Sequence, residues 1–162
     1  MQPSQDNAAP GAALGEFLVI CLCAEWCGVC REYRSGFEEV ARQFSAAGFL
    51  WLDIEAHADD LGDLDVDDFP TLLIKRQDRV LFYGSMLPTP GHLKCTLGAF
   101  LQQTDAESRE YAVSSAARRA WQDDEDLRRL GQAAGASGRT GKRLAASLSG
   151  DAYWSCCEVW LR

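Results

Sequence analysis

The sequence has few of the features that mark membrane proteins or nucleic-acid-binding proteins. Its clearest apolar run, at 17–24, has eight residues, whereas a membrane-spanning helix needs about 20. Lysine and arginine together number 16 against 24 aspartates and glutamates, which gives a net charge of −8 and no attraction to nucleic acid or an anionic membrane. The first residues lack the basic start of a secretory signal. We therefore expect a soluble, cytoplasmic protein with no nucleic-acid or membrane partner.

Histidine is also scarce, and this limits the metal sites that the chain offers. A Cys-X-X-Cys pair binds zinc together with a second pair of cysteine or histidine ligands at suitable spacing. The two histidines, His57 and His92, are isolated, and Cys156 and Cys157 are adjacent, an arrangement that chelates a single ion poorly. We predict no metal and no other cofactor, with zinc as the weaker alternative.

Cysteine, in contrast, is plentiful. The chain has seven cysteines, at positions 21, 23, 27, 30, 95, 156 and 157. The number is odd, and 162 residues are enough to bury a core without a disulfide scaffold. The cysteines therefore suit a reducing compartment, in which thiols are kept free or used for chemistry.

The hydrophobic pattern predicts an α/β domain followed by an extension. Strands are expected at 17–23, 49–55, 71–75 and 79–84, and helices at 29–47 and 91–102, with Gly48 ending the first helix. Residues 56–69 are strongly acidic and indicate a short helix and a loop. The balance of charge changes near residue 104, and 105–130 carry a thin stripe of small apolar residues at helical spacing. We therefore divide the chain into a lead-in (1–16), a domain (17–103), a helical extension (104–131) and a flexible tail (132–162).

Two of the cysteines, Cys27 and Cys30, fall where the first predicted strand meets the first predicted helix. The unpaired N–H groups in the first turn of a helix carry partial positive charge and stabilise a thiolate. At positions i and i+3 the two sulfurs share one helical face. Cys27 is the more exposed and suits attack, whereas Cys30 is one turn in and suits the resolution of a mixed disulfide. This pattern favours a redox pair over the alternatives, half of a zinc site or two inert core cysteines.

The cysteine pair and its surroundings, AEWCGVC, resemble the active site of the thioredoxin family, whose usual motif is WCGPC after a buried strand. Phe69-Pro70-Thr71 matches the family's turn of a hydrophobic residue, a cis-proline and a threonine. Gly84 falls where the family has a glycine near the rim of the site. The order β-α-β, connector, β-β-α over residues 17–102 is that of the thioredoxin core. The resemblance implies an α/β thioredoxin fold, a central mixed sheet flanked by helices, here with a helical or partly disordered C-terminal extension.

The resemblance also implies an activity and a site. The protein is expected to be a thiol–disulfide oxidoreductase that transfers electrons to protein disulfides, with Cys27 and Cys30 as its redox-active disulfide. A recycling reductase would be its second partner, and the chain is expected to act as a monomer. The substrate groove that the family's motifs imply is formed by Trp26, Gly28, Val29, Phe69, Pro70 and Gly84.

Several residues depart from the family's pattern. Val29 replaces the usual proline between the cysteines, and Cys21 and Trp51 stand where the family has a buried aspartate and its matching lysine as a proton relay. Cys21 and Cys23 share one face of their strand. They are therefore either inert core residues, which we favour, or thiols that approach Cys30 and compete as resolving groups. The missing relay leaves open an alternative function, a binding or adaptor module with weak or no redox catalysis.

The flanks of the domain and its acidic segment raise further alternatives. The family's usual first strand and helix are not apparent before residue 17, so either that edge is trimmed or residues 105–130 cover it. The tail with Cys156 and Cys157 is a docking segment, a source of extra resolving thiols or, as we favour, a poorly ordered end. The acidic segment at 59–68 is either an ordinary solvated loop or a filter that selects basic substrates.

Overall fold

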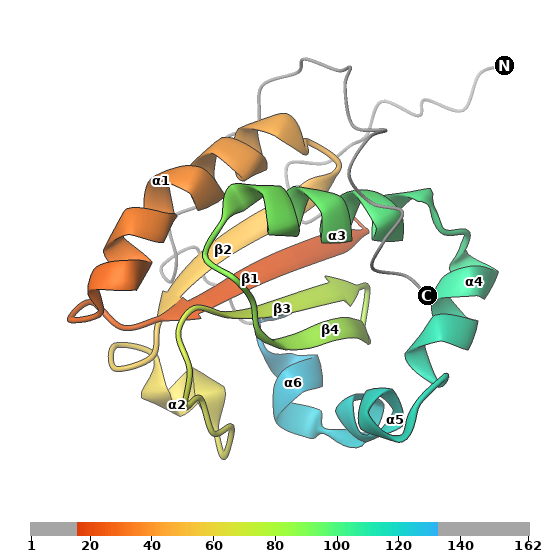
Figure 1. The fold of residues 1–162 in the computed structure, drawn as a ribbon. Coiled ribbons are helices and arrows are strands. Elements are labelled where there is room, and N and C mark those ends of the chain that lie inside the picture. Colours follow the sequence, from red (N-terminus) through yellow and green to blue (C-terminus); the bar gives the residue numbers. More distant parts are fainter. Residues whose placement is uncertain (1–15, 133–162) are drawn as a thin grey trace, which may run out of the picture.

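A computed structural model of the chain describes residues 16–132, which form a sheet flanked by helices (Figure 1). The elements follow the order β1 (Phe17–Cys23), α1 (Gly28–Gln43), β2 (Ala47–Asp53), α2 (Ala58–Leu61), β3 (Thr71–Arg76), β4 (Arg79–Ser85), α3 (Pro90–Gln102), α4 (Asp105–Ala112), α5 (Ala116–Asp123) and α6 (Glu125–Arg129). The strands and helices predicted for 17–102 are all present. Gly48 does not end the first helix, because it pairs with Leu18 inside β2, and α1 already ends at Gln43.

The sheet is mixed, as predicted, and its strands lie in the order β2-β1-β3-β4. β1 runs parallel to β2 and antiparallel to β3, and β3 pairs with β4 as an antiparallel hairpin. All seven residues of β1 are buried, because this strand lies between two others and is covered on both faces. A continuous apolar run such as FLVICLC is typical of a strand in that position.

The alternation of side chains along β1 gives the sheet two different faces. One face, here called the thiol face, carries Cys21 and Cys23 beneath α1 and α3. The other, here called the aliphatic face, carries Leu18, Ile20 and Leu22 and is covered by α2 and α6. Figure 1 shows these helices on opposite sides of the sheet. The prediction that Cys21 and Cys23 share a face is thus confirmed.

The two helices on the thiol face pack closely at one glycine. Gly36 lies in the middle of α1, where glycine is unfavourable compared with alanine by about 1 kcal/mol. A Cβ atom at this position would collide with the ring of Pro90, the first residue of α3. The glycine therefore weakens α1 locally but permits the close approach of α3.

Residues 104–130 form three short helices that pack onto the sheet, and not one long helix. Each helix begins at a residue whose side chain accepts a hydrogen bond from the backbone of its first turn: Thr104 for α4, Ser115 for α5 and Asp124 for α6. Such N-caps start new helices and so divide the segment. Leu127 and Leu130 are buried on the aliphatic face. Within residues 16–132 no strand precedes β1. The segment 104–130 packs on the aliphatic face and along β4.

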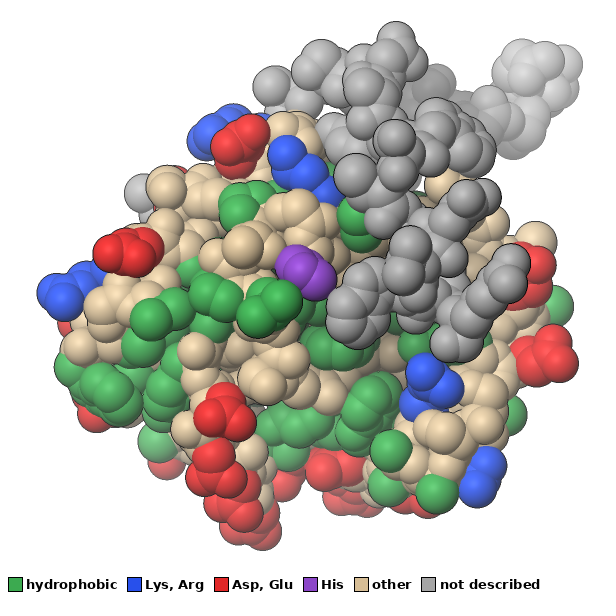
Figure 2. Space-filling view, in the orientation of Figure 1, with side chains coloured by type: hydrophobic (Ala, Val, Ile, Leu, Met, Phe, Trp, Pro, Cys, Tyr) green, Lys and Arg blue, Asp and Glu red, His purple; other side chains and the backbone are tan. Residues whose placement is uncertain are grey.

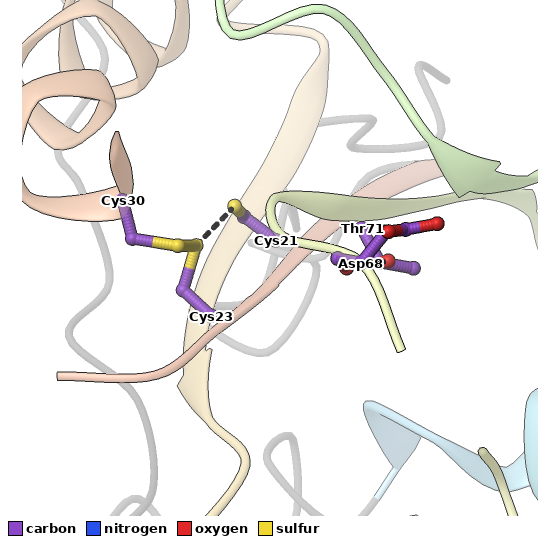
Figure 3. The surroundings of a disulfide bond; sticks show 5 residues. All are labelled: Cys21, Cys23, Cys30, Asp68 and Thr71. Atoms are coloured by element: carbon purple, nitrogen blue, oxygen red, sulfur yellow. Dashed lines mark hydrogen bonds between the residues drawn. A yellow bond between two sulfur atoms is a disulfide. The ribbon is translucent and has the colours of Figure 1, made fainter. Parts of the chain in front are cut away.

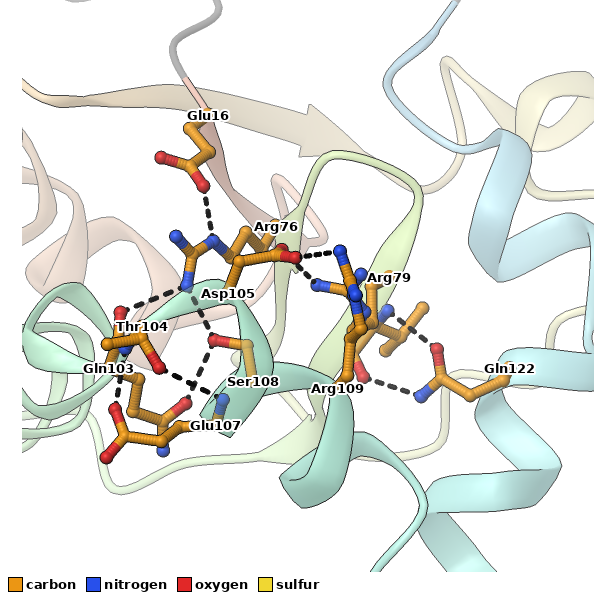
Figure 4. Close-up of polar contacts among 11 residues, drawn as sticks. Glu16, Arg76, Arg79, Gln103, Thr104, Asp105, Glu107, Ser108, Arg109 and Gln122 are labelled. Atoms are coloured by element: carbon orange, nitrogen blue, oxygen red, sulfur yellow. Dashed lines mark hydrogen bonds and ion pairs between the residues drawn. The ribbon is translucent and has the colours of Figure 1, made fainter.

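Polar contacts also fasten this segment to the β3–β4 hairpin (Figure 4). Arg76, at the end of β3, donates hydrogen bonds to the Gln103 carbonyl and to the Ser108 hydroxyl, at 3.0 and 2.8 Å, and pairs with Glu16. The Gln122 side-chain amide bonds both the N–H and the C=O of Val80 on β4, at 3.0 and 2.7 Å. The segment is thus packed against the hairpin, and the change in charge balance near residue 104 does not coincide with a gap in packing.

A buried lysine joins β3 to the end of α6. Lys75 donates hydrogen bonds to the carbonyl oxygens of Arg128 and Leu130, the latter at 3.2 Å. Carbonyl groups at a helix C-terminus lack partners within the helix and attract positive charge. Burial lowers the pKa of Lys75 from its ordinary 10.5 to about 8; Asp78 opposes this shift and Arg128 adds to it. The ammonium group is thus held in the core by two backbone acceptors.

Two further observations concern localisation and the tail. None of the helices in residues 16–132 is long and apolar enough to cross a membrane. The lead-in at 1–15 and the tail at 133–162, with Cys156 and Cys157, lie outside the described residues.

Candidate thiol site at the β1–α1 connection

Cys27 lies at the N-cap of α1, the strand-to-helix turn that the sequence predicts. Its backbone N–H donates to the Ala24 carbonyl at 3.0 Å, and its own carbonyl accepts from the Arg31 N–H at 3.2 Å. The second of these is the first hydrogen bond of the helix. The side chain is half-buried and its thiol is free. Cys27 is therefore held in place by its backbone while its sulfur stays accessible.

Cys30 lies one turn further along α1 and faces the interior. Its exposed fraction is 1%, and its sulfur is bonded to that of Cys23 at the end of β1, with a Cα–Cα distance of 5.9 Å (Figure 3). The resemblance implied a bridge between Cys27 and Cys30, so the observed pairing differs from the expected one. The reason is that the Cys30 side chain and the Cys23 side chain both point into the core of the thiol face, whereas Cys27 lies at its edge.

Cys21 adds a third sulfur to this buried cluster. Its Sγ atom lies 3.6 Å from the Sγ atom of Cys23. Because Cys23 carries no proton while it is bonded to Cys30, the Cys21 thiol is the donor of this hydrogen bond. Burial raises the pKa of Cys21 far above the ordinary range of a thiol. Cys21 is therefore a neutral donor in the core.

The strand register shows what surrounds Cys21. It pairs with Trp51 on β2, so the two residues that replace the family's aspartate and lysine are neighbours. The buried polar residues of the described part of the chain are Thr71, Lys75, Arg76 and Ser108, and no carboxylate is among them.

Tyr33 places a hydroxyl group in the same cluster. It lies one helical turn after Cys30 and packs with the buried cysteines. Its hydroxyl oxygen is buried and has no hydrogen-bond partner within residues 16–132. Burial, and then a charge on Cys21, raise the pKa of Tyr33. Tyr33 thus adds a neutral hydroxyl to the buried cluster that holds the sulfurs.

The Phe69-Pro70-Thr71 turn lies beside the cysteines. The Phe69–Pro70 peptide bond is cis, as the resemblance implies. The Thr71 hydroxyl donates to the Asp68 carbonyl at 2.6 Å (Figure 3), and the Pro70 carbonyl accepts from the Met86 N–H at 3.3 Å. The first bond closes the turn, and the second fixes it to the residue that follows β4.

An exposed aromatic residue connects the turn with the cysteine loop. Trp26 is 64% exposed, and its ring meets the Phe69 ring edge to face, with centroids 5.6 Å apart. The indole N–H donates to the Glu55 carboxylate at 3.0 Å. Val29 is 44% exposed on the first turn of α1. The structure thus places these side chains on the surface around Cys27.

The two predicted glycines lie at different places. Gly28 is exposed and begins α1 directly after Cys27. Gly84 lies on β4, two strands from the cysteine loop, in register with Leu72 on β3. Gly28 therefore belongs to the immediate surroundings of the thiol, and Gly84 to the neighbouring hairpin.

Two residues of this region were not predicted from the sequence. The spacing of Tyr33, three residues after Cys30, would have placed its side chain above the cysteines, but an aromatic residue on an apolar helical face is more often simple core. Glu55 fixes Trp26 across 29 positions of sequence, and no local pattern indicates such a contact. Cys23 was considered only as a competing thiol.

The surface near the site is acidic on one side. Figure 2 shows carboxylates projecting from α2 and the loop that follows it. Asp59, Asp63, Asp65, Asp67 and Asp68 are all exposed. Within residues 16–132 no group of three or more histidine, cysteine, aspartate or glutamate side chains is arranged to hold a metal ion.

Comparisons with known proteins bear on this site. The thioredoxin family model matches residues 13–86, and no curated protein matches the sequence. Among solved structures, the germline-specific thioredoxin Deadhead from Drosophila melanogaster is similar at 27% identity, with a TM-score of 0.49 over 54% of this chain and 84% of that one. Mitochondrial thioredoxin 3 from Saccharomyces cerevisiae is similar at 18% identity, with a TM-score of 0.48 over 54% and 81%. The oxidised thioredoxin from Plasmodium falciparum is similar at 17% identity, with a TM-score of 0.48 over 54% and 84%.

The family match covers the elements that build the site. It begins before β1, includes the cysteines at positions 21–30 and the Phe69–Pro70 turn, and ends at the residue after β4. The mixed sheet with helices on both faces agrees with the fold that the resemblance to this family implies. Residues 13–86 therefore match the thioredoxin family, and the described elements have the fold of that family.

Proposed function

We propose that the protein is a thiol–disulfide oxidoreductase that reduces or exchanges disulfides in protein substrates. The observation that carries the proposal is the position of Cys27, a free and accessible thiol at the N-cap of α1, one turn before Cys30 and beside the Phe69–Pro70 turn. A thiolate is the nucleophile in disulfide exchange, and it must be reached by its substrate. Of the cysteines at the β1–α1 connection, only Cys27 meets the second condition.

The proposed reaction begins with the reduced protein. The Cys27 thiolate attacks one sulfur of a substrate disulfide, and the other substrate sulfur leaves as a thiolate that takes a proton from water. The Cys30 thiolate then attacks the Cys27 sulfur. A Cys27–Cys30 disulfide forms, and the second substrate sulfur leaves. A partner reductase returns both cysteines to thiols, as expected for a protein of a reducing compartment.

The surface around Cys27 would bind the substrate. Trp26 and Val29 offer exposed apolar area, and Trp26 is fixed by both Phe69 and Glu55. An aromatic side chain held in one orientation binds a partner at a lower entropic cost than a mobile one. Gly28, Pro70 and Gly84 complete the proposed groove. We propose that the protein acts as a cytoplasmic monomer.

A test of the proposal compares insulin reduction by three full-length proteins. Replacing the nucleophile, Cys27→Ser, is expected to lower the rate by at least about a hundredfold, because a hydroxyl is a poor nucleophile toward a disulfide. Cys95→Ser, at a half-buried position on α3, is the matched control and should keep the wild-type rate. Turnover by Cys27→Ser close to that of the wild type would refute the proposal.

One observation favours a second candidate, a binding or adaptor module. Cys30 is bonded to Cys23, so in this state Cys27 has no resolving partner on α1. A protein locked in that state would hold clients through the surface around Trp26 without turning them over. Retention of client binding by Cys27→Ser, together with no insulin reduction by the wild type, would favour this candidate.

A further inference from the structure

We propose that Cys23 is a third redox cysteine, which displaces Cys27 as the disulfide partner of Cys30. The oxidised protein then stores its disulfide in the core as Cys23–Cys30 and keeps Cys27 as a free thiol. This inference rests on the proposed function and deepens it, because it assigns a second oxidised state to the same site. It differs from an ordinary two-cysteine cycle, in which the nucleophile stays blocked until a reductase frees it.

The geometry of the backbone supports the transfer. Cys23 ends β1 and Cys30 lies in the first turns of α1, and their Cα atoms are 5.9 Å apart. Disulfides form over Cα distances of about 4.4–6.8 Å. Both side chains point into the thiol face, as Figure 3 shows. The strand and the helix therefore hold the two sulfurs ready to bond without moving the backbone.

The proposed step is an internal exchange that balances by itself. The Cys23 thiolate attacks the Cys30 sulfur of the Cys27–Cys30 disulfide. The Cys23–Cys30 bond forms, the Cys27–Cys30 bond breaks, and Cys27 leaves as a thiolate. The proton that Cys23 loses is matched by the one that Cys27 gains. One disulfide replaces another, so no oxidant or reductant is consumed.

Burial gives this exchange its direction and its slowness. A free thiol at the position of Cys27 is hydrated, whereas a free thiol at the position of Cys23, which is 1% exposed, is not. The exchange thus moves the free thiol from the core to the surface. The same burial makes the attacking Cys23 thiolate rare, and we expect the transfer to follow substrate release and not to precede it.

A neutral donor contacts the attacking sulfur, and a buried hydroxyl lies in the same cluster. The Cys21 thiol lies 3.6 Å from the Cys23 sulfur, and the hydroxyl of Tyr33 is buried in the same cluster without a partner in the described part of the chain. A buried thiolate is stabilised by hydrogen bonds from neutral groups. Cys21 is therefore a positioning residue that lowers the cost of the Cys23 thiolate, in a core that holds no buried carboxylate within residues 16–132.

The stored disulfide changes what the oxidised protein can do. With Cys27 free and Cys30 occupied, the protein can still form a mixed disulfide with a substrate. It cannot resolve that bond through Cys30. A thiol of the substrate itself must release Cys27, and the net result is rearrangement of substrate disulfides. The reduced protein would thus act as a reductase and the oxidised protein as an isomerase.

The sequence offers a direct way to locate the bridge. Cleavage after glutamate separates residues 17–25, which contain Cys21 and Cys23, from residues 26–32, which contain Cys27 and Cys30. A full-length chain with Cys95→Ser, Cys156→Ser and Cys157→Ser keeps only the four cysteines of the site. This protein is reduced, oxidised with one equivalent of the small disulfide 5,5′-dithiobis(2-nitrobenzoate), quenched in acid at intervals, alkylated, digested and analysed by mass spectrometry.

The expected result is a change of bridge with time. Early samples should contain a bridge within 26–32, and late samples a bridge between 17–25 and 26–32 with Cys27 alkylated. At equilibrium the second should exceed the first by at least about tenfold, the scale on which a difference of 30 mV acts in a two-electron couple. Cys23→Ala should keep the bridge within 26–32 at all times. Cys21→Ala should still form the link between peptides but more slowly, because the attacking sulfur loses its neighbouring donor.

The outcome that overturns the inference is a wild-type site in which the bridge stays within 26–32 and Cys27 stays blocked. This result needs no change to the four cysteines of the site, so it holds even if Cys23→Ala does not fold. The oxidant is a small disulfide, so the result is also independent of the proposed function. Loss of insulin reduction with a bridge that still moves to Cys23 would refute the proposed function alone. Normal insulin reduction with an unmoved bridge would refute the inference alone.

Discussion

The two faces of the sheet are built from the same four strands but differ in chemistry. The thiol face buries Cys21, Cys23 and Cys30 together with a tyrosine hydroxyl that has no partner within residues 16–132. The aliphatic face buries leucine, isoleucine and valine side chains, and the buried Lys75 beside them donates to two carbonyls. Groups that can react are therefore placed on one side, and α6 lies on the other. Changes to each face should act on different properties of the protein.

The largest effect on stability is expected from the aliphatic face. Leu127 on α6 is 1% exposed, and truncation of a buried leucine to alanine costs about 2–5 kcal/mol. Leu127→Ala should lower the free energy of unfolding by this amount in urea denaturation. The rate of insulin reduction per folded molecule should stay unchanged, because α6 lies on the face away from the cysteines.

A control in the same segment makes this prediction specific. Val113, after α4, is 51% exposed, and its replacement by alanine should change the stability by no more than about 0.5 kcal/mol. If Leu127→Ala were as stable as Val113→Ala, residues 104–130 would not close the aliphatic face in solution.

A second prediction uses the titration of Lys75. Burial lowers its pKa to about 8 from 10.5, so between these values the unfolded chain binds more protons than the folded one. Stability therefore rises with pH across this window. Methionine does not titrate. Between about pH 8 and pH 10.5, the free energy of unfolding of the wild type should therefore rise by up to roughly 3 kcal/mol relative to that of Lys75→Met.

The comparison of the two proteins removes other contributions to the pH dependence. Cys21 and Tyr33 also have shifted pKa values and ionise in the unfolded chain at high pH, but they are present in both proteins. Urea denaturation at several pH values measures the difference. Parallel stability curves for the two proteins would show that Lys75 is not buried as a charge.

The smallest effects concern the helices over the thiol face. At Gly36, overpacking against Pro90 costs about 1–3 kcal/mol and exceeds the gain in helix propensity of about 1 kcal/mol. The middle of the overpacking range less the propensity gain leaves a net cost of about 1 kcal/mol, so Gly36→Ala should lower the stability by about this amount. Gly98 lies in α3 with open space beside it, so Gly98→Ala should raise the stability by up to about 1 kcal/mol. An equal gain at both positions would show that α1 and α3 do not meet at Gly36.

The elements of residues 17–102 could be predicted because their hydrophobic patterns agree with their turn residues. The apolar run of β1 and the helical spacing in α1 each have one structural solution in a covered sheet. The placement of Cys21 and Cys23 on one face followed from the period of a strand. The division of 105–130 into three helices was missed because Ser115 and Asp124 were not recognised as N-caps.

The pairing of cysteines shows what a sequence pattern leaves undetermined. Spacing alone indicates that Cys27 and Cys30 share a helical face, and the family's motif favours a bridge between them. The partner of Cys30 depends also on how the end of β1 meets the first turns of α1, which is set by the packing of the whole sheet. For the same reason the contacts of Lys75 with α6 and of Trp26 with Glu55 had no local signal.

The contact between Gln122 and Val80 has a consequence for association between chains. β4 is an edge strand of the sheet, and an unpaired edge is a template for strand addition by another molecule. The Gln122 amide occupies both backbone groups of Val80 on this edge, and thus acts as a one-residue substitute for a neighbouring strand. A second copy that approached β4 at this point would find its hydrogen-bonding positions already filled, which protects the hairpin against edge-to-edge aggregation.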